Sequence, residues 1–212
     1  MNAAWAVTST VAGAAGVIVV PWLASRGFRQ LGHQAEPSGR LRLASGLAGS
    51  AGSLAAVAAS RHPGLASELP ALLAWSWALT AGSYCDALTQ RVPTPIVRQG
   101  AMVTVLLLAA SALARGSYGG LELAFVASAV VGACLAACWR FAGLGFGDVR
   151  LGALGGLGLG HGTTAGLVAA AVVSAVTVGG QVVITIARGG NWHTRFPVGP
   201  ALAGAFLVGA AL

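Results

Sequence analysis

Apolar residues run along this chain in long stretches, separated by short segments that hold the arginines and most of the prolines. The chain shows no alternation of polar and apolar positions of the kind that indicates the strands of a membrane barrel. A helix of about 20 residues crosses the hydrocarbon core of a bilayer, and in lipid each helix satisfies its own backbone hydrogen bonds. The pattern therefore predicts an all-α fold, a polytopic bundle of transmembrane helices.

Eight stretches are candidates for membrane spans. They are Ala3 to Ala24, Leu43 to Ser60, Leu69 to Cys85, Gln99 to Ala114, Leu121 to Trp139, a glycine-rich piece from near Asp148 to near His161, Thr163 to Ala187, and Phe196 to Leu212. The fourth and sixth are the weakest candidates, and the sixth is expected to have little contact with lipid. We interpret residues 1–212 as one membrane-embedded domain, in which Ser25 to Arg42 forms a short cytoplasmic loop.

Composition supports a bilayer as the solvent. Only 8% of the residues are charged and 56% are hydrophobic, whereas a soluble domain is typically about 25% charged. The net charge of +7 raises the question of a nucleic-acid partner. Such binding needs basic residues gathered on one face, and here the arginines are scattered as pairs between apolar runs. We therefore expect the lipid bilayer to surround the chain, and we expect no nucleic-acid partner.

The arginines also predict an orientation. Short cytoplasmic loops carry the positive excess in membrane proteins, and ten of the twelve arginines fall on one side of the predicted spans. Only Arg61 and Arg115 are left for the other side. Both termini are then outside, and Asp86 and Asp148 both lie at the cytoplasmic edge.

Asp86 and Asp148 are the only aspartates in the sequence. An ionisable residue in or beside a membrane span is a functional candidate, because burying an unpaired charge is costly. Each has a simpler interpretation: Asp148 as the N-cap of the sixth span, and Asp86 as a solvated residue just past a helix end. Together, on one face of the membrane and at the ends of two helices, they have the parts of a carboxylate pair.

A carboxylate pair has a characteristic chemistry. Two neighbouring carboxyl groups share a proton, so one acts as general base and the other as general acid. Such a pair hydrolyses peptides with water alone, without a metal or another cofactor. Gly145 and Gly147, which lack a Cβ, permit unusual backbone angles and close approach beside Asp148. Cys134 and Cys138 are spaced i, i+4 but belong to no four-ligand set, so we expect no metal site.

Three stretches, in order, resemble the motifs of one family. They are CDALTQRVPTPIV (Cys85 to Val97), GFGDVRLGALGGLGLG (Gly145 to Gly160) and FPVGPALAGA (Phe196 to Ala205). The first has a proline seven residues after its aspartate, and the second contains Gly-x-Gly-Asp. The chain resembles the prepilin peptidases, also called type IV leader peptidases, which are polytopic membrane aspartic proteases. The resemblance covers roughly the last two-thirds of the chain.

The resemblance implies that Asp86 and Asp148 are the catalytic pair. It also marks a set of supporting motif residues: Gly145, Gly147, Arg150, Pro93, Pro197, Gly199 and Pro200. The implied substrate is a prepilin or pseudopilin precursor, with a short basic leader ending in glycine before an apolar helix. Cleavage would occur at the cytoplasmic face of the bacterial inner membrane, with no cofactor.

The chain departs from the family's pattern at several positions. Arg150 stands where the family often has lysine, Val198 where phenylalanine is usual, and Thr94 where asparagine or aspartate is common. Many bacterial members also carry a cytoplasmic domain with two Cys-x-x-Cys pairs, associated with N-methylation of the cleaved pilin. The segment Ser25 to Arg42 has no cysteine and is too short for a domain. We therefore expect leader cleavage without N-methylation.

Two other classes of protein remain as alternatives. A small proton-coupled transporter also places carboxylates in helices, but its site usually lies near the bilayer midplane between repeated halves, and no convincing repeat is present. A non-catalytic assembly protein would need neither aspartate. Replacing both aspartates with asparagine distinguishes it from a protease.

Overall fold

The computed structural model describes residues 3–32, 38–61, 65–142, 144–159, 164–187 and 197–212. Within these residues the chain forms α-helices and one short 3-10 helix, and no strand. The elements are α1 (Ala3–Gln30), α2 (Gly39–Ser60), the 3-10 helix η1 (Ala66–Glu68), α3 (Leu69–Thr89), α4 (Thr94–Arg115), α5 (Gly119–Ala142), α6 (Phe146–Leu159), α7 (Thr164–Ala187) and α8 (Gly199–Ala211). The predicted all-α fold is confirmed, with a helix at each of the eight predicted places.

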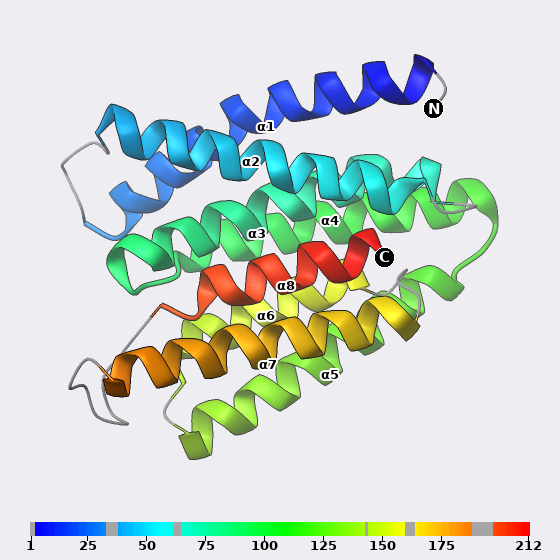
Figure 1. Ribbon diagram of the computed structural model, residues 1–212. Coiled ribbons are helices and arrows are strands. Elements are labelled where there is room, and N and C mark those ends of the chain that lie inside the picture. The colour runs from blue at the N-terminus through cyan, green and yellow to red at the C-terminus, as the bar shows by residue number, and fades with distance from the viewer. Residues whose placement is uncertain (1–2, 33–37, 62–64, 143, 160–163, 188–196) are drawn as a thin grey trace.

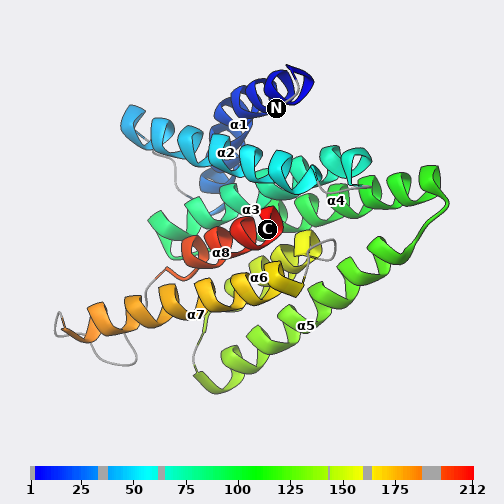
Figure 2. The same ribbon diagram turned by 45° about the vertical axis from the view of Figure 1, so that its right-hand side comes forward.

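Consecutive α-helices run in opposite directions through one bundle (Figure 1). Both termini lie at one end, and α3 finishes and α6 begins at the other, which we call the aspartate end (Figures 1 and 2). Helix α3 is the centre of the bundle, because it packs against α1, α2, α4, α6 and α8. Helices α6 and α8 also pack on each other, so α3, α6 and α8 form a mutually packed group.

Among the described residues, four helices are long and apolar enough to cross a bilayer: Ala4–Gln30, Gly39–Ser60, Thr94–Arg115 and Gly119–Phe141. Many of their large apolar side chains face outward, such as Ile18, which is 72% exposed, and Phe141, which is 84% exposed. Outward apolar side chains on a helical bundle are expected where lipid is the solvent. That the other four helices also cross the membrane stays a prediction.

Polar side chains inside the bundle fix how α3 sits against its neighbours. The indole N–H of fully buried Trp75 in α3 donates to the carbonyl of Leu154 in α6, with an N···O distance of 2.8 Å. A second indole, Trp77, donates to the Ser53 hydroxyl of α2 at 2.8 Å. A buried indole N–H needs a partner, and these two bonds set the rotation and height of α3 relative to α2 and α6.

A glycine face on α6 receives α5. A Cβ built on Gly156 would lie 2.6 Å from the backbone Cα of Ser128, and one built on Gly152 would collide with Leu135. The Ser128 hydroxyl donates to the Ala153 carbonyl at 2.7 Å. Small residues permit such close helix contact. Close packing against α5 therefore accounts for the glycines at positions 152 and 156.

Several helix ends differ from the predicted ones. Helix α1 continues to Gln30 and α2 begins at Gly39, so the connection is residues 31–38, shorter than the predicted loop from Ser25 to Arg42. Gly32, with φ +81°, follows the end of α1 in the left-handed conformation that commonly stops a helix. Helices extend past their apolar runs because their backbone hydrogen bonds do not depend on lipid.

Candidate active site

Asp86 lies in the last turn of α3, where it is buried at 5% exposure. The simple interpretation of it as a solvated residue past a helix end is therefore wrong. Its Oδ2 accepts a hydrogen bond from the backbone N–H of Gly199 at 2.9 Å. Gly199 is the first residue of α8, so the N-terminus of one helix holds the carboxylate at the C-terminus of another.

Asp148 lies in the first turn of α6 and is 7% exposed. Its backbone N–H donates to the Gly145 carbonyl at 3.1 Å, which starts the helix. Asp148 is therefore the third residue of α6 and not its N-cap. Its Oδ1 is buried and accepts no hydrogen bond from the part of the chain that the structure describes. An acidic oxygen thus lies inside the fold without a hydrogen-bond donor among the described residues.

A pocket of about 320 Å³ brings these two residues together. It is lined by Leu31, Asp86, Gln90, Arg91, Val92, Gly145, Phe146, Gly147, Asp148 and Arg150. The lining comes from the C-terminal ends of α1 and α3, the α3–α4 turn and the start of α6. The two carboxyl groups are near enough for the charge of one to act on the other. Residues 62 positions apart thus share one cavity at the aspartate end.

The two motif glycines act through space and not through unusual backbone angles. The glycines with positive φ among the described residues are Gly32 and Gly116, so the expectation of unusual angles at Gly145 and Gly147 is wrong. A Cβ on Gly147 would lie 3.0 Å from the Cβ of Val92, and a Cβ on Gly145 would lie 2.9 Å from Oδ2 of Asp148. Their missing side chains permit close approach, which is the other half of the prediction.

The predicted supporting residues occupy different positions around the pocket. Arg150 lines it, donates to the Thr94 hydroxyl at 2.5 Å, and places its guanidinium 4.6 Å from the ring centroid of Phe146. Pro93 is fully buried and precedes α4, while Pro197 and Pro200 flank the start of α8. None of these three prolines lines the pocket. They shape the turns that deliver Thr94 and Gly199.

Sequence reasoning missed part of the lining. Leu31, Gln90, Val92 and Phe146 were not singled out, and Arg91 entered only through its charge. Gln90 had one available signal, since it lies four residues after Asp86, one helical turn on. Leu31 had none, because its place beside Asp86 depends on how α1 packs across α3.

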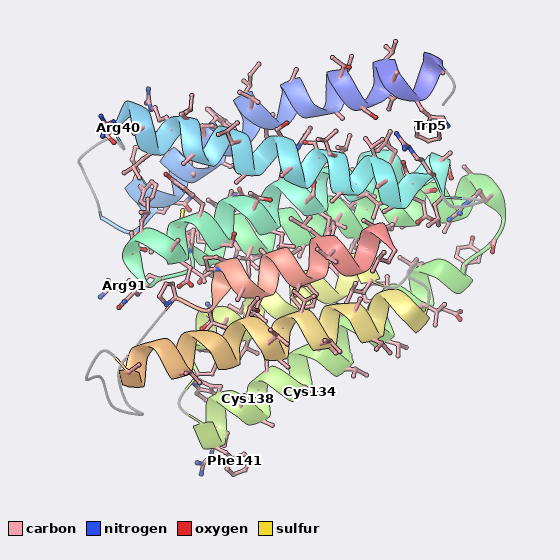
Figure 3. All side chains as sticks on the ribbon, in the orientation of Figure 1. Trp5, Arg40, Arg91, Cys134, Cys138 and Phe141 are labelled. Atoms are coloured by element: carbon pink, nitrogen blue, oxygen red, sulfur yellow. The ribbon has the colours of Figure 1, made fainter. Side chains whose placement is uncertain are left out.

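The arrangement suits hydrolysis by a carboxylate pair. Two buried carboxyl groups facing one cavity favour a state that holds a single proton between them, with one group charged and one neutral. Such a pair can accept a proton from water and return one to a leaving group. The cavity lies at the aspartate end, where the exposed arginines Arg40 and Arg91 also lie (Figure 3).

Comparison with known proteins bears on what this cavity does. A model of the type IV leader peptidase family matches residues 73–180, slightly more than half of the chain. The chain belongs to the type IV leader peptidase family. Membership makes the protein a protease of the membrane, and it confirms the resemblance seen in the motifs. No curated protein and no solved structure matches the chain.

The family match and the site overlap only partly. Residues 73–180 contain Asp86, Asp148 and most of the pocket lining. Leu31 at the end of α1 and Gly199 at the start of α8 lie outside the match, yet one lines the pocket and the other holds Asp86. The candidate site is therefore completed by helices on both sides of the matched segment.

Proposed function

We propose that this chain is an aspartic endopeptidase that removes the leader from type IV pilin-like precursors, with Asp86 and Asp148 as its catalytic pair. One observation carries the proposal: two buried aspartates from helices far apart in the sequence face the same cavity. A non-catalytic assembly protein has no need of this arrangement. A transporter is disfavoured because the pair lies at one end of the bundle, whereas transport sites usually lie near the midplane.

The reaction needs one water and one shared proton. The ionised aspartate takes a proton from the water as the water oxygen attacks the scissile carbonyl carbon. The protonated aspartate gives its proton to the carbonyl oxygen, and the tetrahedral intermediate then collapses. The C–N bond breaks as the proton held by the first aspartate passes to the leaving amine, and the second aspartate recovers its proton from the new carboxyl group.

We assign the base to Asp86 and the acid to Asp148. A hydrogen bond from a backbone N–H stabilises a charged carboxylate, as does a helix N-terminus. Asp86 receives both from Gly199 at the start of α8. Asp148 also lies in the first turn of a helix and has the backbone N–H of Gly145 beside it. It differs from Asp86 in its Oδ1, which is buried and accepts no hydrogen bond from the described residues, and this suits a neutral carboxyl group.

We place the aspartate end at the cytoplasmic face of the bacterial inner membrane. Exposed arginines gather there on the ends of several helices: Arg26, Arg29, Arg40, Arg91, Arg140 and Arg150. At the opposite end Arg115 forms an ion pair with Glu68, which reduces the positive charge of that end. Positive charge concentrates on the cytoplasmic side of membrane proteins, so a leader would be cut from the cytoplasm.

The substrate and product follow from the same proposal. The substrate is a prepilin or pseudopilin with a short leader, and the product keeps its apolar helix in the membrane. The connection between α1 and α2 is residues 31–38, which leaves no room there for a cysteine-rich methyltransferase domain. The product would therefore carry a free, unmethylated N-terminus.

Co-expression tests the proposal directly. The full chain is produced with candidate pilin precursors in cells that lack other leader peptidases, and cleavage is followed by the mobility shift on loss of the leader. Mass spectrometry of the mature N-terminus then shows the cut site and any methyl group. Intact precursors in every pairing would contradict the proposal, and a methylated product would contradict the unmethylated N-terminus.

A further inference from the structure

Gln90 has a backbone conformation that is unusual for its residue type. Its φ is +53° and its ψ is 31°, and among the described residues it is the one non-glycine with positive φ. Glycine adopts this left-handed conformation without steric cost and is the common choice after a helix. A non-glycine residue held there points to a use for its side chain.

The turn around Gln90 is fixed from both sides. The Gln90 N–H donates to the Asp86 carbonyl at 2.8 Å. The hydroxyl of Thr89 lies 2.8 Å from the Cys85 carbonyl oxygen and 3.1 Å from that of Arg91. The strained residue is therefore anchored to the backbone of Asp86 itself, and its position follows that of the aspartate.

Gln90 also lies between the two halves of the site. It lines the pocket together with Asp86 and Asp148. Val92, two residues further on, contacts Gly147, which directly precedes Asp148. The α3–α4 turn thus bridges the two aspartates, and Gln90 is the uncharged polar residue in a lining whose other polar side chains are charged.

We propose that Gln90 is a substrate-positioning residue whose side-chain amide hydrogen-bonds the backbone of the precursor beside the scissile bond. The inference rests on the proposed peptidase function. A peptide segment must leave its helix to be cut, and its exposed N–H and C=O groups then need hydrogen-bond partners. A glutamine amide both donates and accepts, so it suits a peptide group better than a second charge does.

A purely structural role for Gln90 makes a different prediction. If the residue only ends α3, glycine should serve at least as well, because it relieves the strained φ. Gln90→Gly should then raise the melting temperature and keep full cleavage. If the amide holds substrate, the same change should keep or raise the melting temperature and still impair cleavage.

The experiment compares three variants of the full-length, purified protein with a prepilin-like substrate in the same lipid vesicles. Gln90→Gly should lower kcat/KM about tenfold, the upper end of the effect expected from one lost hydrogen bond. Gln90→Asn keeps an amide and tolerates left-handed φ, so it should recover part of the loss. Gln99→Ala removes an exposed amide outside the pocket lining and should leave cleavage unchanged.

The shape of the pH profile separates this role from acid–base chemistry. Gln90 does not titrate, so its variants should lower the profile without changing its shape. Wild-type kcat/KM in Gln90→Gly, or equal losses in the glycine and asparagine variants, would overturn the inference while leaving the peptidase proposal standing. A wild-type protein that cleaves no precursor would overturn both.

Discussion

Around the two aspartates, the absence of a side chain at three glycines matters as much as the side chains that are present. Gly145, Gly147 and Gly199 each stand where a Cβ would reach a neighbour at about the limit of contact, from 2.8 to 3.0 Å. At Gly145 and Gly199 that neighbour is an aspartate carboxylate oxygen. These glycines make room for the carboxyl groups, and substitutions there are expected to affect chemistry before stability.

We expect Gly147→Val largely to abolish cleavage while the protein still accumulates in the membrane. A Cβ at this position would lie 3.0 Å from the Cβ of Val92, and valine adds two more methyl groups. The start of α6 must then move away from the α3–α4 turn, and Asp148 moves with it. Quantitative immunoblotting of protein and substrate measures both outcomes. Near-normal cleavage would show that this contact has no influence on the pair.

Gly199→Ala should lower cleavage about 100-fold, the effect expected when a reacting group is displaced by about 1 Å. Its Cβ would lie 2.8 Å from Oδ2 of Asp86, so the carboxylate must shift or lose its hydrogen bond. Gly204→Ala, in the same helix and with no described atom within 4 Å of its Cβ, is the matched control. Equal activity of the two variants, assayed with the same precursor, would contradict the role given to α8.

The aspartates could be found from the sequence because charge is rare in this chain, and their glycines because they belong to the motifs that resemble those of the family. Leu31 and Val92 could not, since an apolar residue among many apolar residues carries no local signal. The left-handed turn at Gln90 was equally hidden, because glutamine is not typical of positive φ. The hydrogen bond from Gly199 to Asp86 joins residues 113 positions apart and depends on tertiary packing.

Among the elements, α6 depends most on its neighbours. It is only 14 residues long, and α3, α4, α5 and α8 surround it. Its glycines let α5 approach on one side, and the indole of Trp75 fixes it to α3 on the other. The position of Asp148 therefore depends on helix packing along the whole of α6.

Gly156→Ala should destabilise the protein by about 1–3 kcal/mol, as overpacking typically does. The added Cβ would lie 2.6 Å from the Ser128 Cα, and a backbone atom cannot turn aside as a side chain can. Thermal unfolding in detergent, with Gly204→Ala as the control, measures the difference. An unchanged melting temperature would mean that α5 and α6 are not held as closely as the structure shows.

The places of the helices followed from the apolar runs, but their ends did not. Contact with lipid requires apolar residues along a helix, whereas backbone hydrogen bonding determines where the helix stops. Helix α3 therefore passes the predicted end at Cys85 and includes Asp86 in its last turn, and α4 begins at Thr94, before the predicted Gln99. These extensions contain residues of the candidate site. The site therefore lies outside the apolar runs from which the helices were predicted.

For the whole molecule, the bundle gives a simple topology. Both termini lie at the end away from the aspartates (Figure 1), so every helix runs between the same two ends. If each helix crosses the membrane, both termini are on one side and Asp86 and Asp148 lie at the other, which we propose is the cytoplasmic side.

Reporter fusions test this topology. A fusion at Leu212 should be active with a periplasmic reporter, and one in the α3–α4 turn at Arg91 should be active with a cytoplasmic reporter, because the exposed arginines gather at the aspartate end. Cytoplasmic activity at Leu212 together with periplasmic activity at Arg91 would reverse the orientation and contradict cleavage from the cytoplasm.

The most direct test of the central claim is cleavage by the Asp86→Asn and Asp148→Asn variants at matched expression, with Glu122→Gln, an exposed carboxylate on α5 outside the pocket, as the control. Asparagine keeps the shape but cannot exchange the proton, so each variant should lose about 1,000-fold or more of the activity. The wild-type pH profile should be bell-shaped, with apparent values that belong to the pair. Retained cleavage in either asparagine variant would contradict the assignment of Asp86 and Asp148 as one catalytic pair.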